Sequence, residues 1–174
     1  MHRLTIVQGE HAVVREPGTI IQTVLGSCIA VCLADPVRRQ GGMNHFLLGC
    51  PGTAKLEAHE LQRYGVHAME LLVNALMRCG SSRSDLRAHL YGGATMIAGL
   101  GDIGRQNIAI ARGYLATEGI KVGHEDVGGN RARRIEFLAF EGRSRCRVAL
   151  EPFAPQTAAP LASVTDNAGE LELF

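Results

Sequence analysis

The chain contains short apolar runs and two segments in which apolar residues recur at helical spacing, and glycine or proline separates these segments. The first fifty residues contain three stretches rich in β-branched and other apolar side chains, which predicts three strands. Helical spacing of apolar residues then appears twice, around another short apolar run, and the last third is again typical of strands. The predicted strands span residues 20–25, 28–33, 43–48, 86–91, 120–126, 134–140 and 146–150, and the predicted helices span 61–79 and 102–118.

This order of elements predicts an α/β domain of the layered α+β kind, with a mixed sheet and two principal helices. The length of 174 residues suits one domain with its own core. After residue 150 the composition changes to proline, alanine and acidic residues. We therefore expect a folded domain over residues 1–150 and a disordered tail over residues 151–174.

Composition narrows the class of protein. Hydrophobic residues make up 46% of the chain and charged residues 20%, which is typical of a soluble globular protein. The net charge is +1 and aromatic residues are 5%, so the late cluster of arginines does not by itself indicate nucleic-acid binding. No apolar run reaches the ~18 residues that span a bilayer, and the N-terminus lacks a signal-peptide pattern. We expect a cytoplasmic protein without membrane insertion.

The cysteines are five in number, which in a reducing compartment predicts thiols rather than disulfides. No C-x-x-C pair occurs, and the histidines lack the spacing of metal ligands, so we expect neither a metal nor a cofactor. Small buried hydrophobic positions account for three of the cysteines, namely Cys32, Cys79 and Cys146. Cys28 differs because it follows two small residues at the start of a predicted strand.

Cys28 and His45 have the spacing of a nucleophile and its base. They lie 17 positions apart, which suits two neighbouring strands joined by a turn. A nearby imidazole is a common means of activating a thiol. Gly26 and Ser27 leave the backbone accessible, so its N–H groups could bind a developing oxyanion. The residues alone leave open the alternative of a buried structural thiol and a hydrogen-bonded core histidine.

A second motif, GLGDIG at residues 99–104, fits the G-x-G-x-x-G outline of a dinucleotide-binding loop. A predicted helix follows it, and the acidic pair Glu125 and Asp126 comes after the next strand. However, the N-terminal half indicates hairpins rather than a second βαβ unit, and Asp102 would place a negative charge beside the phosphates. We interpret the motif as a tight loop in which backbone approaches backbone.

The stretch TVLGSCIAVCLADPVRRQGGMNHFLL resembles the CheD family, the chemoreceptor glutamine deamidases of bacterial chemotaxis. The matching features are a G-S-C start to a strand, a D-P turn and a G-G-M-x-H strand. The resemblance continues through LYGGATM at 90–96, IGRQN at 103–107 and HEDVGGNRARRIEF at 124–137, and covers about residues 5–150. It implies a layered α/β fold similar to that of toxins that deamidate glutamine.

The resemblance implies a protein-glutamine amidohydrolase in which Cys28 is the nucleophile and His45 the general base and acid. The family's third residue is a threonine just before the G-S-C motif that orients the histidine. Thr23 is the nearest candidate, and its neighbour Gln22 would face the other side of the strand. Asn44 would point away from His45 and is expected to be structural.

The resemblance also implies methyl-accepting chemoreceptors as protein substrates and a CheC-type phosphatase as a possible regulator. A receptor helix would need an open groove rather than a deep pocket. The alternative, from a different functional class, is a non-catalytic chemotaxis adaptor that keeps the fold and acts only by binding receptors or the phosphatase.

Overall fold

The computed structural model describes residues 2–48, 58–96 and 102–149. Cys50, Leu150, the first two glycines of the GLGDIG motif and the expected tail over 151–174 lie outside the described residues. The described strands are β1 (His2–Thr5), β2 (His11–Val14), β3 (Thr19–Leu25), β4 (Ile29–Asp35), β5 (Gln40–Phe46), β6 (Arg87–Gly92), β7 (Lys121–Val127), β8 (Arg133–Leu138) and β9 (Arg143–Val148). The described helices are α1 (Ala58–Arg78) and α2 (Ile103–Thr117).

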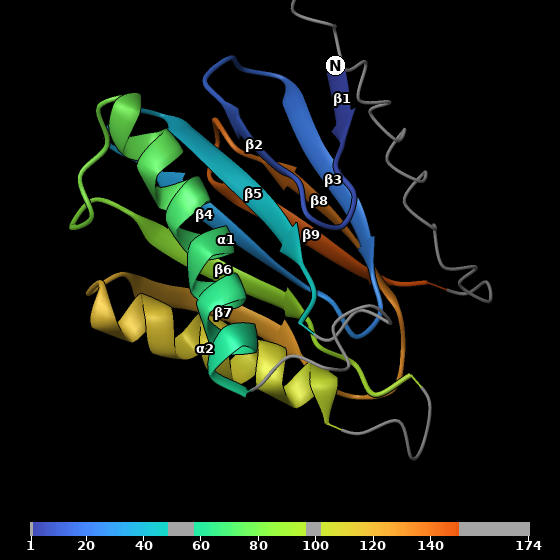
Figure 1. Ribbon diagram of the computed structural model, residues 1–174. Helices are drawn as coiled ribbons and strands as arrows, with labels where there is room; N and C mark the ends of the chain where they lie inside the picture. The colour runs from blue at the N-terminus through green and yellow to red at the C-terminus, as the bar shows by residue number, and fades with distance from the viewer. Residues whose placement is uncertain (1, 49–57, 97–101, 150–174) are drawn as a thin grey trace, which may run out of the picture.

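The strands form two stacked sheets, and both helices lie on the outer face of the larger one (Figure 1). The smaller sheet has the order β1-β3-β8-β9, and the larger has the order β2-β5-β4-β6-β7. Each sheet is mixed: β1 runs parallel to β3 and β6 parallel to β7, while the other pairs are antiparallel. The predicted fold class is thus confirmed, with two mixed sheets where the pattern indicated one.

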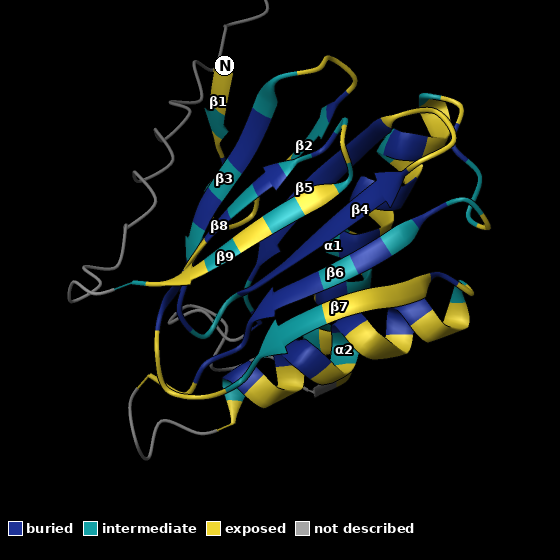
Figure 2. Cartoon of the chain, turned by 180° about the vertical axis from the view of Figure 1, so that it is seen from behind, coloured by how far each residue is buried: buried dark blue, intermediate teal, exposed yellow. Residues whose placement is uncertain are grey.

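Strand β4 lies at the centre of the molecule and is buried along its whole length (Figure 2). One face of the strand, with Ile29, Val31 and Leu33, packs toward the helices. The other face carries small side chains, including Ala30 and Cys32, and packs toward the smaller sheet. A strand covered on both faces is expected to be apolar throughout, which explains its sequence IAVCLA. None of the described helices is long and apolar enough to cross a membrane.

The structure adds two strands that the hydrophobic pattern did not predict. β1 and β2 have four residues each and lie at the edges of their sheets. β5 also begins earlier than predicted, at Gln40, so the two glycines before Met43 lie inside the strand. A Cβ atom at Gly42 would lie 2.6 Å from the carbonyl oxygen of Ala12 on β2. These glycines therefore serve close packing inside the sheet.

Two connections between the sheets meet at one end of the sandwich. The chain passes from β1 to β2 through residues 6–10, and from β3 to β4 through residues 26–28. Because β1 and β3 are parallel, both connections leave the smaller sheet at the same end. β5 is antiparallel to β4 and so ends beside the start of β4. The carboxyl end of β5 therefore lies next to both connections.

Candidate active site

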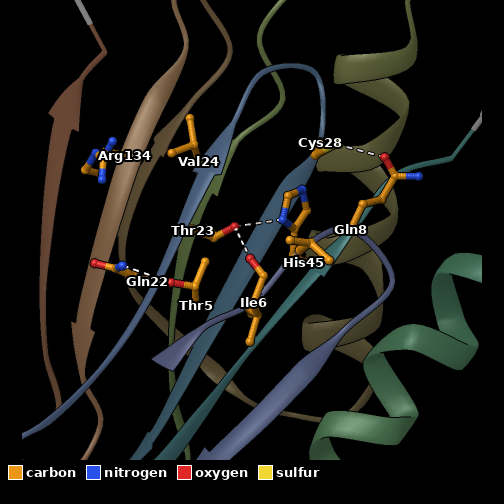
Figure 3. Close-up of a pocket in the computed structure, with 10 residues that line it drawn as sticks. Thr5, Ile6, Gln8, Gln22, Thr23, Val24, Cys28, His45 and Arg134 are labelled. Atoms are coloured by element: carbon orange, nitrogen blue, oxygen red, sulfur yellow. Dashed lines mark hydrogen bonds between the residues drawn. The ribbon is translucent and has the colours of Figure 1, made fainter. Parts of the chain in front are cut away.

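A small cavity opens where these two connections meet the end of β5 (Figure 3). Its volume is about 110 Å³. Pockets for whole small-molecule ligands usually enclose ~300–1,000 Å³, so this cavity suits a single side chain. Three predicted site residues line it, namely Cys28, His45 and Thr23.

Strand register places Cys28 and His45 on one face of the larger sheet. Cys28 immediately precedes β4, and His45 is the penultimate residue of β5. Ala30 pairs with His45, and Cys28 precedes Ala30 by two positions, so its side chain points to the same side. The predicted strand pairing is confirmed. His45 was expected near the middle of its strand but lies near the end, because β5 begins at Gln40 and stops at Phe46.

Thr23 holds the imidazole of His45 from the opposite sheet. Its Oγ1 lies 2.8 Å from Nδ1 of His45 and also donates to the carbonyl oxygen of Ile6, at 2.8 Å. A hydroxyl has one hydrogen, and a carbonyl oxygen can only accept. Because that hydrogen goes to Ile6, Thr23 must accept from His45, which places the ring proton on Nδ1. The lone pair of the neutral imidazole is then on Nε2.

Burial keeps His45 unprotonated. The residue is 6% exposed, and burial lowers its pKa to about 4, although the carboxylate of Glu10 acts in the opposite direction. Within the described part of the chain, Nε2 has no hydrogen-bond partner. A buried polar atom without a partner is costly and therefore uncommon in native proteins. The arrangement leaves a neutral nitrogen base whose lone pair is available to a group in the cavity.

The neighbours of Thr23 and His45 in sequence have other partners. Gln22 donates to the hydroxyl of Thr5 at 2.9 Å, so of the two candidates it is Thr23 whose side chain contacts the imidazole. Asn44 accepts from the backbone N–H of Val31 at 3.0 Å and donates to the carbonyl of Ala68 on α1 at 3.2 Å. The expectation that Asn44 faces away from His45 and has a structural role is confirmed.

The loop before β4 is held through three consecutive carbonyl groups. The carbonyl oxygen of Gly26 accepts from the N–H of Ala94 at 3.0 Å, and that of Cys28 accepts from the N–H of Gly93 at 2.7 Å. The carbonyl oxygen of Ser27, between them, accepts from a side-chain amide at 2.9 Å. Fixing each carbonyl fixes the peptide planes of the loop and hence the direction of its N–H groups.

Asn107 is a site residue to which sequence reasoning gave no role. Its Nδ2 is the donor to the Ser27 carbonyl, and its Oδ1 accepts from the N–H of Leu48 at 2.9 Å. The residue is fully buried on α2. One amide thus joins the loop that carries Cys28 to the segment just after β5, and β5 is the strand that carries His45. Its only sequence signal was a place in the IGRQN stretch.

Of the other described cysteines, two are kept protonated by their surroundings. Burial strongly raises the pKa of the Cys32 thiol. Burial also raises the pKa of Cys146 to about 12, with a further contribution from the Asp126 carboxylate. These thiols fit the expected structural role. Within the three described ranges, no cluster of three His, Cys, Asp or Glu side chains could hold a metal ion.

Comparison with known proteins places the chain among bacterial chemotaxis proteins. A sequence model of the family described as CheD chemotactic sensory transduction matches residues 51–148. A probable chemoreceptor glutamine deamidase CheD of Zymomonas mobilis is 47% identical, over 99% of this chain and 92% of its own length. The chain belongs to the CheD family. A relative with the same name in Agrobacterium fabrum is 48% identical over 82% of this chain and 78% of its own length.

The match to a solved structure, that of the Bacillus licheniformis hypothetical protein YfiH, covers 67% of this CheD-family chain and 49% of the YfiH chain. The TM-score is 0.43 and the sequence identity 16%.

The dinucleotide-binding alternative finds no support in the described residues. Gly104, the last glycine of the motif, lies in the first turn of α2, where a Cβ atom would lie 2.4 Å from the carbonyl oxygen of Gly93. Arginines already pair with the acidic residues that would bind a ribose, Glu125 and Asp126.

Proposed function

We propose that this chain is a protein-glutamine deamidase that converts glutamine side chains of methyl-accepting chemoreceptors to glutamate, with Cys28 as the nucleophile. The main support is one observation: Cys28 and His45 line a cavity of side-chain size, and among the described residues Nε2 of His45 has no hydrogen-bond partner. The names of the relatives supply the substrate class, chemoreceptor glutamines.

The first half of the proposed reaction forms a thioester. Nε2 of His45 takes the proton from Cys28, and the sulfur attacks the carboxamide carbon of the substrate glutamine. The electron pair of the carbonyl moves to oxygen and gives a tetrahedral oxyanion. When this intermediate collapses, the carbon–nitrogen bond breaks, and the imidazolium of His45 donates its proton so that ammonia leaves.

The second half hydrolyses the thioester. His45 Nε2 takes a proton from water, whose oxygen attacks the same carbon. The carbon–sulfur bond then breaks, and the proton returns to the sulfur. The sum consumes one water and releases glutamate and ammonia, and no external oxidant, reductant or cofactor is needed. Thr23 keeps Nδ1 protonated throughout, so that Nε2 is the atom that exchanges protons.

The oxyanion of both intermediates needs hydrogen-bond donors. We assign this role to backbone N–H groups of the loop at Gly26 and Ser27. Bonds to the carbonyl oxygens of these two residues fix the peptide planes that carry the N–H groups of Ser27 and Cys28. A preorganised donor of this kind is worth ~3 kcal/mol of transition-state stabilisation in comparable sites. In the cell, the reaction would take place in the cytoplasm, where a CheC-type phosphatase is the proposed regulator.

The test is the mass of a purified receptor cytoplasmic fragment after incubation with the protein. Each converted amide adds about 1 Da, and peptide mass spectrometry locates the glutamine. We expect the gain with the wild type and with Cys79→Ala, a matched change at a half-buried thiol away from the cavity. We expect none with Cys28→Ala. No gain with wild type, despite tight binding of a cognate fragment, would contradict the proposal and favour the non-catalytic adaptor.

A further inference from the structure

Gln8 occupies a rigid turn at the rim of the cavity. The N–H of Glu10 donates to the carbonyl of Val7 at 3.0 Å, which closes a β-turn with Gln8 and Gly9 at its centre. Gly9 has φ of +89°, as the third position of a type II turn requires. The carboxylate of Glu10 also accepts from the N–H of Val7 at 2.8 Å. The turn therefore has a defined shape, with the Gln8 side chain at its corner.

This turn is attached to the backbone of the proposed base. The N–H of Gly9 donates to the carbonyl of His45 at 2.8 Å, and the N–H of His45 donates to the carbonyl of Glu10 at 3.0 Å. The two bonds, at the two residues that follow Gln8, join the turn to β5. Gln8 and His45 are consequently held in a fixed relation to each other.

The amide of Gln8 reaches the proposed nucleophile. The Cys28 thiol donates to Oε1 of Gln8 over 3.8 Å, a long hydrogen bond of the kind sulfur makes (Figure 3). This contact joins the two connections between the sheets, one carrying Gln8 and the other Cys28. Nothing in the local sequence around Gln8 indicated it.

Loss of the thiol proton changes the contact between the Cys28 sulfur and Oε1 of Gln8 from attractive to repulsive. Once Cys28 has given its proton to His45, the sulfur is an anion with nothing to donate, and a carbonyl oxygen beside it is repelled. The amide of a glutamine carries an acceptor at one end and two donors at the other. Turning that group about its last bond replaces Oε1 by Nε2–H and places a donor beside the negative charge.

We propose that Gln8 is a catalytic residue of the deamidase reaction, whose side-chain N–H is a second oxyanion donor opposite the backbone N–H groups of the Gly26–Cys28 loop. The inference rests on the function proposed above. Oxyanion donors lie about 3 Å from the oxygen they stabilise. That oxygen is bonded to the carbon that the sulfur attacks, so a group already in contact with the sulfur borders its position.

The test compares Gln8→Met, which keeps the length and removes the donor, with Gln8→Glu, which leaves only acceptors when ionised. Gln106→Met is the matched control, because Gln106 is exposed on α2. We expect kcat on the receptor fragment to fall about 100-fold in both Gln8 variants, with KM nearly unchanged, and to stay at the wild-type value in the control. Alkylation of Cys28 by iodoacetamide forms no oxyanion. The plateau rate of this alkylation at high pH should therefore differ less than about threefold between the Gln8 variants and the wild type.

The possible results separate this inference from the function on which it rests. If wild type deamidates the fragment and Gln8→Met keeps its kcat, the oxyanion role is wrong and the deamidase function stands. A rise in kcat/KM in Gln8→Met, or a mass gain at Gln8 itself in the wild type, would also overturn it, since Gln8 would then be an internal competitor or substrate. If wild type has no activity on a cognate fragment, both proposals fail together.

Discussion

The hydroxyl of Thr23 on the four-stranded sheet and the imidazole of His45 on the five-stranded sheet are joined by a 2.8 Å hydrogen bond across the space between the sheets. Both side chains are buried, with Thr23 3% and His45 6% exposed. A polar contact in such surroundings is strengthened by the low local dielectric. The orientation of the proposed base therefore depends on side chains from both sheets.

Replacing the hydroxyl of Thr23 should impair the chemical step. Thr23→Val keeps the shape but removes the acceptor for the Nδ1 proton, so the ring loses both its orientation and its tautomer. We expect kcat for deamidation to fall about 100-fold with little change in KM, and Thr23→Ser to restore most of it. Steady-state kinetics on the receptor fragment measure both. Wild-type kcat in a folded Thr23→Val variant would contradict the proposed orienting role.

Asn107 should affect stability and activity together. Asn107→Ala leaves the Ser27 carbonyl and the Leu48 N–H without their partner, and each such buried group costs ~1–3 kcal/mol. We expect a loss of about 3 kcal/mol in the free energy of unfolding and a fall in kcat, because the loop that carries Cys28 is released.

Asn44→Ala is the control for that experiment. It also removes a buried amide, but the partners of that amide lie on β4 and α1. The control should lose similar stability in urea denaturation and keep its kcat at temperatures where it is folded. Equal loss of kcat in both variants would show that Asn107 has no particular effect on the site.

The pH dependence of kcat/KM should reflect the burial of His45. Since burial lowers the pKa of its imidazole to about 4, the ring stays unprotonated as the pH falls below the ordinary value of 6.5. Only the unprotonated Nε2 can take the Cys28 proton, so we expect the acid limb of kcat/KM near pH 4. Initial rates would be measured at each pH, and circular dichroism would show at which pH values the protein is folded. A limb near 6.5 in folded protein would contradict this.

The same burial should make stability depend on pH. Between about pH 4 and 6.5 the unfolded chain binds a proton at His45 that the folded chain does not, so stability falls as the pH falls through this range. The contribution is about 3 kcal/mol when complete. Urea denaturation of wild type and His45→Gln at several pH values measures it. Identical slopes of unfolding free energy against pH in the two proteins would contradict the prediction.

Gly92 should tolerate no side chain. Its φ is +104°, and a Cβ atom there would lie 2.2 Å from the carbonyl oxygen of Cys28. We expect Gly92→Ala to cost more than about 2 kcal/mol of stability and to displace the nucleophile. Gly113→Ala on α2, where nothing lies within 4 Å, should instead stabilise by up to about 1 kcal/mol. Thermal unfolding compares the two, and similar melting temperatures would contradict the steric argument.

The sequence predicted the parts of the site that depend on local periodicity. Cys28 and His45 belong to adjacent strands of a hairpin, where spacing and alternation decide which side chains share a face. The helices were predicted for the same reason, since a 3.6-residue repeat is visible within one segment. The resemblance to a known family then singled out Thr23, and the structure places its hydroxyl against the imidazole.

The remaining contacts join residues distant in sequence and leave no local pattern. Asn107 binds the Ser27 carbonyl across 80 positions, and Gln8 meets Cys28 across 20. Neither contact follows from the hydrophobicity of either partner. β1 and β2 were missed because four-residue edge strands give too few alternations to detect. Both strands flank the turn that carries Gln8, so the hydrophobic pattern did not predict that turn either.

The division of the site between two sheets has a consequence for how the protein can be switched off. Each sheet contributes some of the site residues, and these residues meet where the two sheets are in contact at one end. A small separation of the sheets there would release His45 from Thr23 while the core beneath the helices stayed intact. A partner that wedges the sheets apart at that end would thus inhibit the enzyme without entering the cavity, and loss of turnover would precede any spectroscopic sign of unfolding.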